Sequence, residues 1–225
     1  MKRTIFGVAI TALSAIMLSS VASASTVDCS TVNDVTTLTG VNNCSVTGST
    51  LMFSNFAISD SGMTAATVGI ANAAGGTGVF GGEVVLAFEL GGELWTGPTG
   101  FGDILMFYEV TPAISGIDID LQATPVVTGG QMTITEIACS QAFTGTVCNG
   151  TTLANISVTS GGQAVFNSAI FPTTGPVFIK KDISFNGAVT SEFENSQLVP
   201  EPMTLTLMGA GLLGLGVFGR RRFSK

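Results

Sequence analysis

The stretch DILMFYEV (Asp103–Val110) decides the fold class of this chain. Ile104, Met106 and Tyr108 fall on one face of a strand drawn through it, and the opposite face is apolar as well. A strand that is apolar on both faces belongs in the interior of a sheet that is covered on both sides. We therefore expect a central β-strand here.

The segments around this stretch also read as strands. EVVLAFEL (Glu83–Leu90) is apolar at every second residue from Val84, and GIDIDL (Gly116–Leu121) alternates apolar residues with Asp118 and Asp120. Short apolar runs separated by Gly, Thr, Ser and Asn predict further strands at Thr50–Ile58, Ala65–Ala71, Gln131–Ala138, Leu153–Thr159, Ala164–Ile170, Val177–Phe185 and Ala188–Phe193.

Together these segments make about ten strands, with no convincing helix between the two ends of the chain. The pattern predicts a mainly β fold, an antiparallel β-sandwich of the Greek-key type. A β-solenoid is the alternative, but no repeat of fixed length supports it. Lys181 falls on the apolar face of Val177–Phe185, which predicts a bulge or a sheet edge at that point.

The four cysteines form two near pairs, Cys29 with Cys44 and Cys139 with Cys148. An even count of cysteines suits disulfides, and we favour pairing between sequence neighbours over the other connectivities. Zinc is a poor alternative, because the chain has no histidine and no CxxC spacing.

The N-terminus has the three parts of a secretory signal peptide. Lys2–Arg3 form a charged start, Ile5–Leu18 an apolar core, and Ala22 and Ala24 the small-x-small pattern that precedes cleavage. We expect residues 1–24 to be removed, with an uncleaved N-terminal anchor as the alternative.

The last 27 residues place three chemistries in a fixed order. A stiff tripeptide comes first and consists of Pro200, Glu201 and Pro202. An almost uncharged stretch follows at residues 203–219, and then a basic cluster of Arg220, Arg221 and Arg222. Seventeen helical residues rise about 25 Å, just short of the ~30 Å hydrocarbon core, so the stretch spans a membrane only marginally. The arginines would stay on the cytoplasmic side as a stop-transfer cluster.

This tail resembles the sorting signal of PEP-CTERM proteins, and similar tails are described at the end of some ice-binding proteins. The resemblance covers residues 199–225. It implies that an exosortase, a membrane-embedded transpeptidase, recognises Pro200, Glu201 and Pro202 and that the helix at 203–219 is then removed. Residues 25–198 would be the exported β-sandwich domain, held briefly at the inner membrane of a bacterium before reaching the cell surface or the medium.

Charge and composition exclude several functions. Between Asp28 and Glu201 the chain has fifteen acidic residues and only two lysines, a net charge of −13, so a nucleic-acid partner is disfavoured. The lack of histidine removes the usual Ser-His and Cys-His nucleophiles. A glycosidase-type carboxylate pair is not excluded, but nothing singles one out, and we expect no enzyme activity and no cofactor.

Three features could bind a ligand, each with a simpler structural explanation. Trp95 could stack on a sugar, or its ring could plug the end of the sandwich. Asp118 and Asp120 could share a calcium ion, or lie on a solvated strand face; no calcium-loop pattern is present, so we predict no metal site. Thr133 and Thr135 form one short Thr-x-Thr, too little for a regular ice-binding array.

These observations predict an exported, non-catalytic protein of the cell surface or extracellular matrix, sorted through its tail. The alternative is a secreted module that binds carbohydrate, calcium or ice and uses the same tail. Extracellular polysaccharide is a candidate partner of such a module.

Overall fold

The computed structural model describes residues 26–38, 42–61, 68–77, 83–90, 101–190 and 192–199. The predicted signal peptide with Ala22 and Ala24, Trp95, the sorting tripeptide and the arginine cluster lie outside these residues. Within the described residues, no helix is long and apolar enough to cross a membrane, and the stretch 203–219 is not among them.

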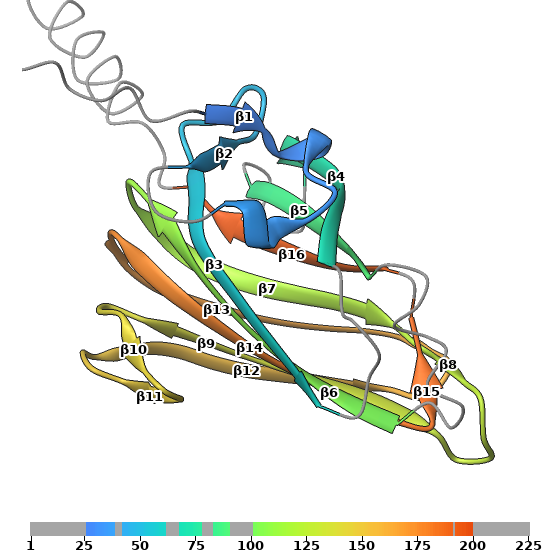
Figure 1. The fold of residues 1–225 in the computed structure, drawn as a ribbon. Coiled ribbons are helices and arrows are strands. Elements are labelled where there is room, and N and C mark those ends of the chain that lie inside the picture. Colours follow the sequence, from blue (N-terminus) through green and yellow to red (C-terminus); the bar gives the residue numbers. More distant parts are fainter. Residues whose placement is uncertain are drawn as a thin grey trace, which may run out of the picture.

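The described chain is mainly β, with two short 3-10 turns as its helical elements (Figure 1). The elements are β1 (Thr26–Asp28), η1 (Cys29–Thr31), η2 (Val35–Thr37), β2 (Asn43–Ser45), β3 (Met52–Ser61), β4 (Val68–Thr77), β5 (Glu83–Leu90), β6 (Phe101–Thr111), β7 (Ile114–Gln122), β8 (Thr124–Pro125), β9 (Gln131–Cys139), β10 (Phe143–Thr144), β11 (Val147–Cys148), β12 (Thr152–Ser160), β13 (Ala164–Thr174), β14 (Val177–Asn186), β15 (Ala188–Val189) and β16 (Glu192–Leu198).

Two large sheets share one hydrophobic core, as in a β-sandwich. The seven-stranded sheet has the order β1-β2-β3-β6-β14-β9-β12, and the five-stranded sheet has the order β13-β7-β16-β5-β4. Most successive long strands lie in opposite sheets; β4–β5 and β9–β12 are the pairs that stay within one. All described strand pairs are antiparallel except β1–β2, which is parallel.

The stretch that predicted the fold forms β6, which lies between β3 and β14 inside the large sheet. Ile104, Met106 and Tyr108 point into the core and are at most 2% exposed, while Phe107 on the other face is only half-buried. The predicted central strand is confirmed. The partial cover over Phe107 comes from the small β10–β11 hairpin, described below.

The prediction for Lys181 is wrong. β14 pairs without a register shift to β6 on one side and to β9 on the other, so it has neither a bulge nor a free edge there. Lys181 nevertheless lies on the core face and is completely buried. Its charge is matched by Glu136 on β9, which makes a bulge unnecessary.

The predicted strand Ala188–Phe193 is two strands. β15 pairs with β8 in a small separate ribbon, and β16 joins the five-stranded sheet between β7 and β5. Figure 1 shows this ribbon at the opposite end of the long strands from the β10–β11 hairpin. Gly187, with φ of 75°, lies between β14 and β15 and adopts a conformation that L-residues avoid.

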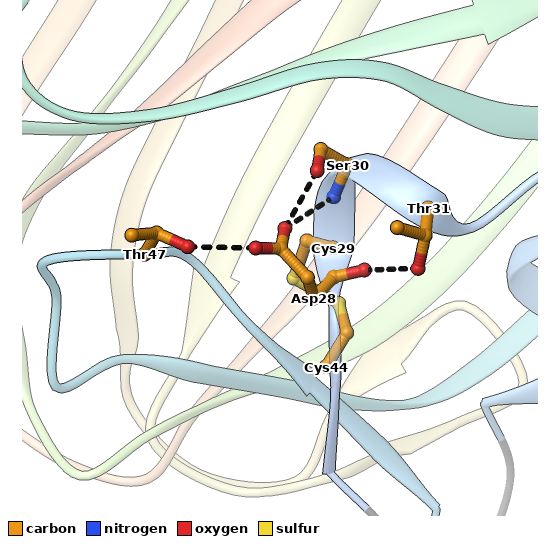
Figure 2. The surroundings of a disulfide bond; sticks show 6 residues. All are labelled: Asp28, Cys29, Ser30, Thr31, Cys44 and Thr47. Atoms are coloured by element: carbon orange, nitrogen blue, oxygen red, sulfur yellow. Dashed lines mark hydrogen bonds between the residues drawn. A yellow bond between two sulfur atoms is a disulfide. The ribbon is translucent and has the colours of Figure 1, made fainter.

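Both favoured disulfides are present. Cys29 bonds to Cys44 and Cys139 to Cys148, with Cα–Cα distances of 4.8 and 5.8 Å. Figure 2 shows the first bridge beneath Asp28, whose carboxylate accepts hydrogen bonds from the Ser30 backbone and side chain and from the Thr47 hydroxyl. These bonds hold the pKa of Asp28 below its usual value of 3.8, the Thr47 contribution being the largest.

Candidate functional site

The outer face of the seven-stranded sheet carries a groove next to the β10–β11 hairpin. It encloses about 450 Å³ and is lined by aromatic rings and by one polar pair, contributed by Asn55, Phe107, Glu109, Phe143 and Phe178. Glu109 and Phe178 are direct neighbours on β6 and β14, so the floor of the groove follows from strand register.

The hairpin that forms one wall is held in place by three local features. Gly145 has φ of 57° in a two-residue turn, which suits the glycine position of a type II′ hairpin. The Cys139–Cys148 disulfide ties β11 to the end of β9. Lys180 donates from Nζ to the carbonyl oxygen of Thr146 at 3.3 Å.

The aromatic floor and wall meet directly. The rings of Phe107 and Phe143 lie 5.6 Å apart at an interplanar angle of 56°. Such a tilted contact is a favourable geometry for aromatic pairs. The pair provides an apolar ring surface on the outer face of β6, whose other face packs into the core.

The polar pair depends on an irregularity in β3. The pairing of β3 with β6 shifts between Ser54 and Ala57, and Asn55 has φ of 55°, a conformation that asparagine tolerates better than most residues. Asn55 Nδ2 donates to Glu109 Oε2 at 2.6 Å. The groove therefore holds a carboxylate and an amide in a fixed mutual orientation beside the rings.

Further along the same face the side chains are polar. Thr133 and Thr159 share a hydrogen bond of 2.9 Å, and Thr135 and Ser157 one of 3.1 Å. The predicted Thr-x-Thr is thus extended by hydroxyls from β12 into a small two-by-two array. The sequence could not show this, because the four residues come from two strands.

Two carboxyl groups adjoin this array. Asp103 on β6 and Asp182 on β14 lie close together, and burial, followed by the charge and hydrogen bond of Asp182, raises the pKa of Asp103. Among the described residues no group of three or more acidic, cysteine or histidine side chains is placed to hold a metal ion.

A second polar cluster lies between the two sheets, in the core. Lys181 Nζ donates to Glu136 Oε2, and both side chains are completely buried. Tyr108 donates from its hydroxyl to Asn195 Oδ1 at 2.7 Å, and Gln197 Nε2 donates to the same hydroxyl oxygen at 3.4 Å. We call Lys181, Glu136, Asn195, Tyr108 and Gln197 the core cluster.

Burial dominates the ionisation of the core cluster. It lowers the pKa of Lys181 and raises the pKa of Glu136, and in each case the charge of the partner opposes the shift. Burial also raises the pKa of Tyr108. Oε1 of Glu136 and Oε1 of Gln197 are buried without a hydrogen bond.

Asp118 and Asp120 do not form a shared site. Asp118 is 3% exposed and accepts a hydrogen bond from the Ser196 backbone amide at 2.9 Å, whereas Asp120 is exposed. Burial raises the pKa of Asp118. The interpretation of both residues as a solvated strand face is therefore wrong for Asp118.

Sequence reasoning did not single out either cluster, although signals for both exist. Glu136 and Lys181 each interrupt the apolar face of a predicted strand, and opposite charges on two core faces indicate a buried pair. Phe107 and Phe178 face outward on strands that bury their other face. Asn55 has no such signal, because its position depends on the irregular pairing of β3.

Comparisons with known proteins add little. A scan against protein-family models found no match, and a search of curated proteins found no significant relative. One similar solved structure is TmCBM61 in complex with beta-1,4-galactotriose, at 11% identity and a TM-score of 0.32, covering 63% of this chain and 83% of that chain. Another is the enzymatically active domain of bacteriophage CBA120 tailspike protein 4, at 11% identity and a TM-score of 0.29. This match covers 63% of this chain and 18% of the tailspike chain.

Proposed function

We propose that this chain is an exported, non-catalytic protein of the cell surface or extracellular matrix. The observation that carries the proposal is the pair of disulfides in the described β domain, because such bonds form and persist in oxidising, extracytoplasmic compartments. The signal-like N-terminus and the acidic, histidine-free composition support it. The proposed localisation therefore draws on the disulfides, the N-terminus and the overall composition of the chain.

In this proposal the tail is the sorting signal. Residues 203–219 hold the exported domain at the membrane, Arg220, Arg221 and Arg222 stay on the cytoplasmic side, and an exosortase cuts near Pro200, Glu201 and Pro202. Proline fixes φ and lacks a backbone N–H, so a Pro-Glu-Pro sequence favours an extended backbone that a peptidase can bind.

Deletion of Pro200–Pro202 tests whether the tail is a sorting signal. We expect the deleted protein to be exported but to stay in the membrane fraction at its unprocessed length, while the natural sequence is processed. A matched control replaces Thr204 and Thr206 by serine, which changes the neighbouring segment without touching the tripeptide. If the deleted protein is processed and distributed like the natural one, the exosortase proposal is wrong.

The groove favours a second function, the binding of a neutral polysaccharide. Ligand pockets combine mostly apolar walls with a few fixed polar groups, and about 450 Å³ falls within their usual range of 300–1,000 Å³. Aromatic rings suit the C–H face of a sugar ring, and the Asn55–Glu109 pair offers donors and acceptors for its hydroxyls. The net charge of −13 makes an anionic polymer a poor ligand.

Polysaccharide pulldown with the secreted protein tests this function. Phe178→Ala and Glu109→Ala should each weaken binding at least tenfold, whereas Phe101→Ala, at a ring that is 48% exposed and outside the groove, should not. Trp95→Ala belongs in the same series, because Trp95 is the residue that the sequence offers as a candidate sugar contact. Binding that depends on Trp95 and not on Phe178 would move the site away from the groove.

A further inference from the structure

The core cluster brings an amine, a carboxyl group and a carboxamide together inside the sandwich. Lys181 on β14 contacts Glu136 on the neighbouring strand β9. Asn195 lies across the core on β16 of the other sheet, and its side chain is close enough to Glu136 to lower the pKa of that carboxyl group. Oε1 of Glu136 is buried and has no hydrogen-bond partner.

Aromatic rings shut this site off from water. Lys181 Nζ lies 5.6 Å from the ring centroid of Phe193, and Phe193 stacks on Phe88 at 5.4 Å. Phe88 in turn contacts Tyr108 at 5.9 Å. Lys181, Glu136 and Asn195 are each 0% exposed. Water that could hydrolyse an activated amide is thereby kept away from the three groups.

Burial disfavours the charged form of both partners, because it lowers the pKa of Lys181 and raises that of Glu136. Transfer of a proton from Nζ to the carboxyl group, which leaves a neutral amine, is therefore easier here than in an exposed ion pair. A neutral, desolvated lysine amine is a nucleophile, whereas the ammonium ion is not.

The carboxamide of Asn195 is held in an activating geometry. Its Oδ1 accepts a hydrogen bond from the Tyr108 hydroxyl at 2.7 Å, which places a donor where negative charge would develop on that oxygen. Its Nδ2 donates to the backbone oxygens of Asp118 and Ser196, at 2.8 and 3.2 Å. The amide is therefore fixed from both sides before any reaction.

We propose that Lys181 and Asn195 condense after folding into an amide bond that joins β14 to β16 across the core. The Lys181 Nζ lone pair attacks Cγ of Asn195, and the tetrahedral oxyanion forms where Tyr108 donates. Glu136 takes a proton from Nζ and delivers one to Nδ2, the Cγ–Nδ2 bond breaks, and ammonia leaves. The step is redox-neutral, needs no co-reactant, and regenerates the Glu136 carboxyl group.

Gln197 is the other carboxamide in the core cluster, but its position favours Asn195 as the acceptor. The Gln197 side chain donates to the Tyr108 oxygen at 3.4 Å, so Tyr108 does not polarise its carbonyl group. The Asn195 side chain is also close enough to Glu136 to lower the pKa of that carboxyl group. The bond would tie the seven-stranded sheet to the five-stranded sheet, in a part of the domain that neither disulfide reaches.

The basic residues of the chain make the test sharp. Lys180 and Lys181 are the only Lys or Arg residues between Asp28 and Glu201, and all four cysteines precede them. Trypsin acting on the denatured, reduced, exported protein should therefore cut after Lys180 but not after a modified Lys181. We expect a fragment that begins at Lys181 and is lighter than its sequence by one ammonia, with fragment ions locating the link at Asn195.

Variants separate the proposal from a simple buried ion pair. Glu136→Gln keeps the shape of the side chain but removes the proton carrier, and Lys181→Arg keeps the charge but removes the amine; both should give fragments of full mass. Lys180→Arg, on the adjacent outward-facing position, should retain the loss of ammonia. A natural protein that shows the β circular dichroism of a folded domain, yields full-mass fragments and is cut after Lys181 would overturn the proposal. A link located at Gln197 would overturn the assignment to Asn195.

Discussion

Lys181 on β14 and Glu136 on β9 form an ion pair in the centre of the sandwich, with neither side chain exposed to solvent. Removing charges from water costs several kcal/mol per ion, and a buried pair recovers this only when its remaining polar atoms are satisfied. Here one oxygen of Glu136 has no hydrogen bond. The pair is thus a costly feature of the core, which is why we assign it a chemical role.

Replacement of Tyr108 by Phe tests the hydrogen bonds of the core cluster. The variant keeps the ring but leaves Asn195 Oδ1 without its donor, so we expect it to unfold with about 1–3 kcal/mol less free energy than the natural protein. Urea unfolding followed by fluorescence or circular dichroism measures this. The control is Thr133→Val on the surface array, expected to change stability by about 0.5 kcal/mol or less. Equal effects of the two substitutions would contradict the account.

Loss of the Cys29–Cys44 bridge should destabilise the domain. The bond closes a loop of 15 residues, for which chain entropy predicts about 3 kcal/mol. The double variant Cys29→Ser, Cys44→Ser should therefore unfold at a lower urea concentration with a similar slope. An unchanged midpoint would mean that the bridge does not constrain the unfolded chain.

Loss of the Cys139–Cys148 bridge should disturb the groove more than the stability of the fold. The bridge spans nine positions and anchors the hairpin that carries Phe143. We expect Cys139→Ser, Cys148→Ser to weaken polysaccharide binding to the same extent as Phe143→Ala. Full binding by a protein that lacks this bridge would show that the hairpin is not a wall of the site.

Asp103 should make stability depend on pH. The pKa of Asp103 is raised in the folded protein. Its contribution to the free energy of unfolding is therefore fully present below the unfolded pKa of 3.8 and is lost as the pH rises through the folded pKa. Asp103→Asn removes this dependence. We expect the stability of the variant relative to the natural protein to increase from acidic to neutral pH, in parallel urea titrations. A constant difference across that range would contradict the raised pKa of Asp103, which burial and Asp182 cause.

Asp28 should show the opposite behaviour. Hydrogen bonds from Thr47 and Ser30 lower the pKa of Asp28. The contribution of Asp28 to the free energy of unfolding is therefore fully present above the unfolded pKa of 3.8 and is lost as the pH falls through the folded pKa. Thr47→Val removes the largest of these bonds and should raise the Asp28 pKa towards 3.8, as measured by carboxyl NMR titration. An unchanged titration would show that the bond in Figure 2 does not form in solution.

The sequence predicted what local chemistry controls. The strand at Asp103–Val110, the alternation of Ile117, Ile119 and Leu121, and the pairing of neighbouring cysteines all follow from residue spacing, and the structure confirms them. Hydrophobic periodicity identifies strands because burial of one face dominates their stability.

The rest depends on contacts between distant strands. Lys181 was expected to disturb its strand because Glu136, 45 residues earlier in the chain, could not be placed next to it. The break between β15 and β16 depends on pairing with β8, and the groove depends on a hairpin from one part of the chain lying over strands from two others. Local periodicity can place Glu136 and Lys181 on core faces, but it does not give the strand order that makes distant residues neighbours.

The intact mass of the protein recovered from outside the cell tests the central claim most directly. Export and processing predict a chain that begins at Ser25, ends near Pro200 and carries both disulfides, with or without an added group at the new C-terminus. A protein found only inside the cell, with its mass accounting for all residues from Met1 to Lys225, would contradict the account.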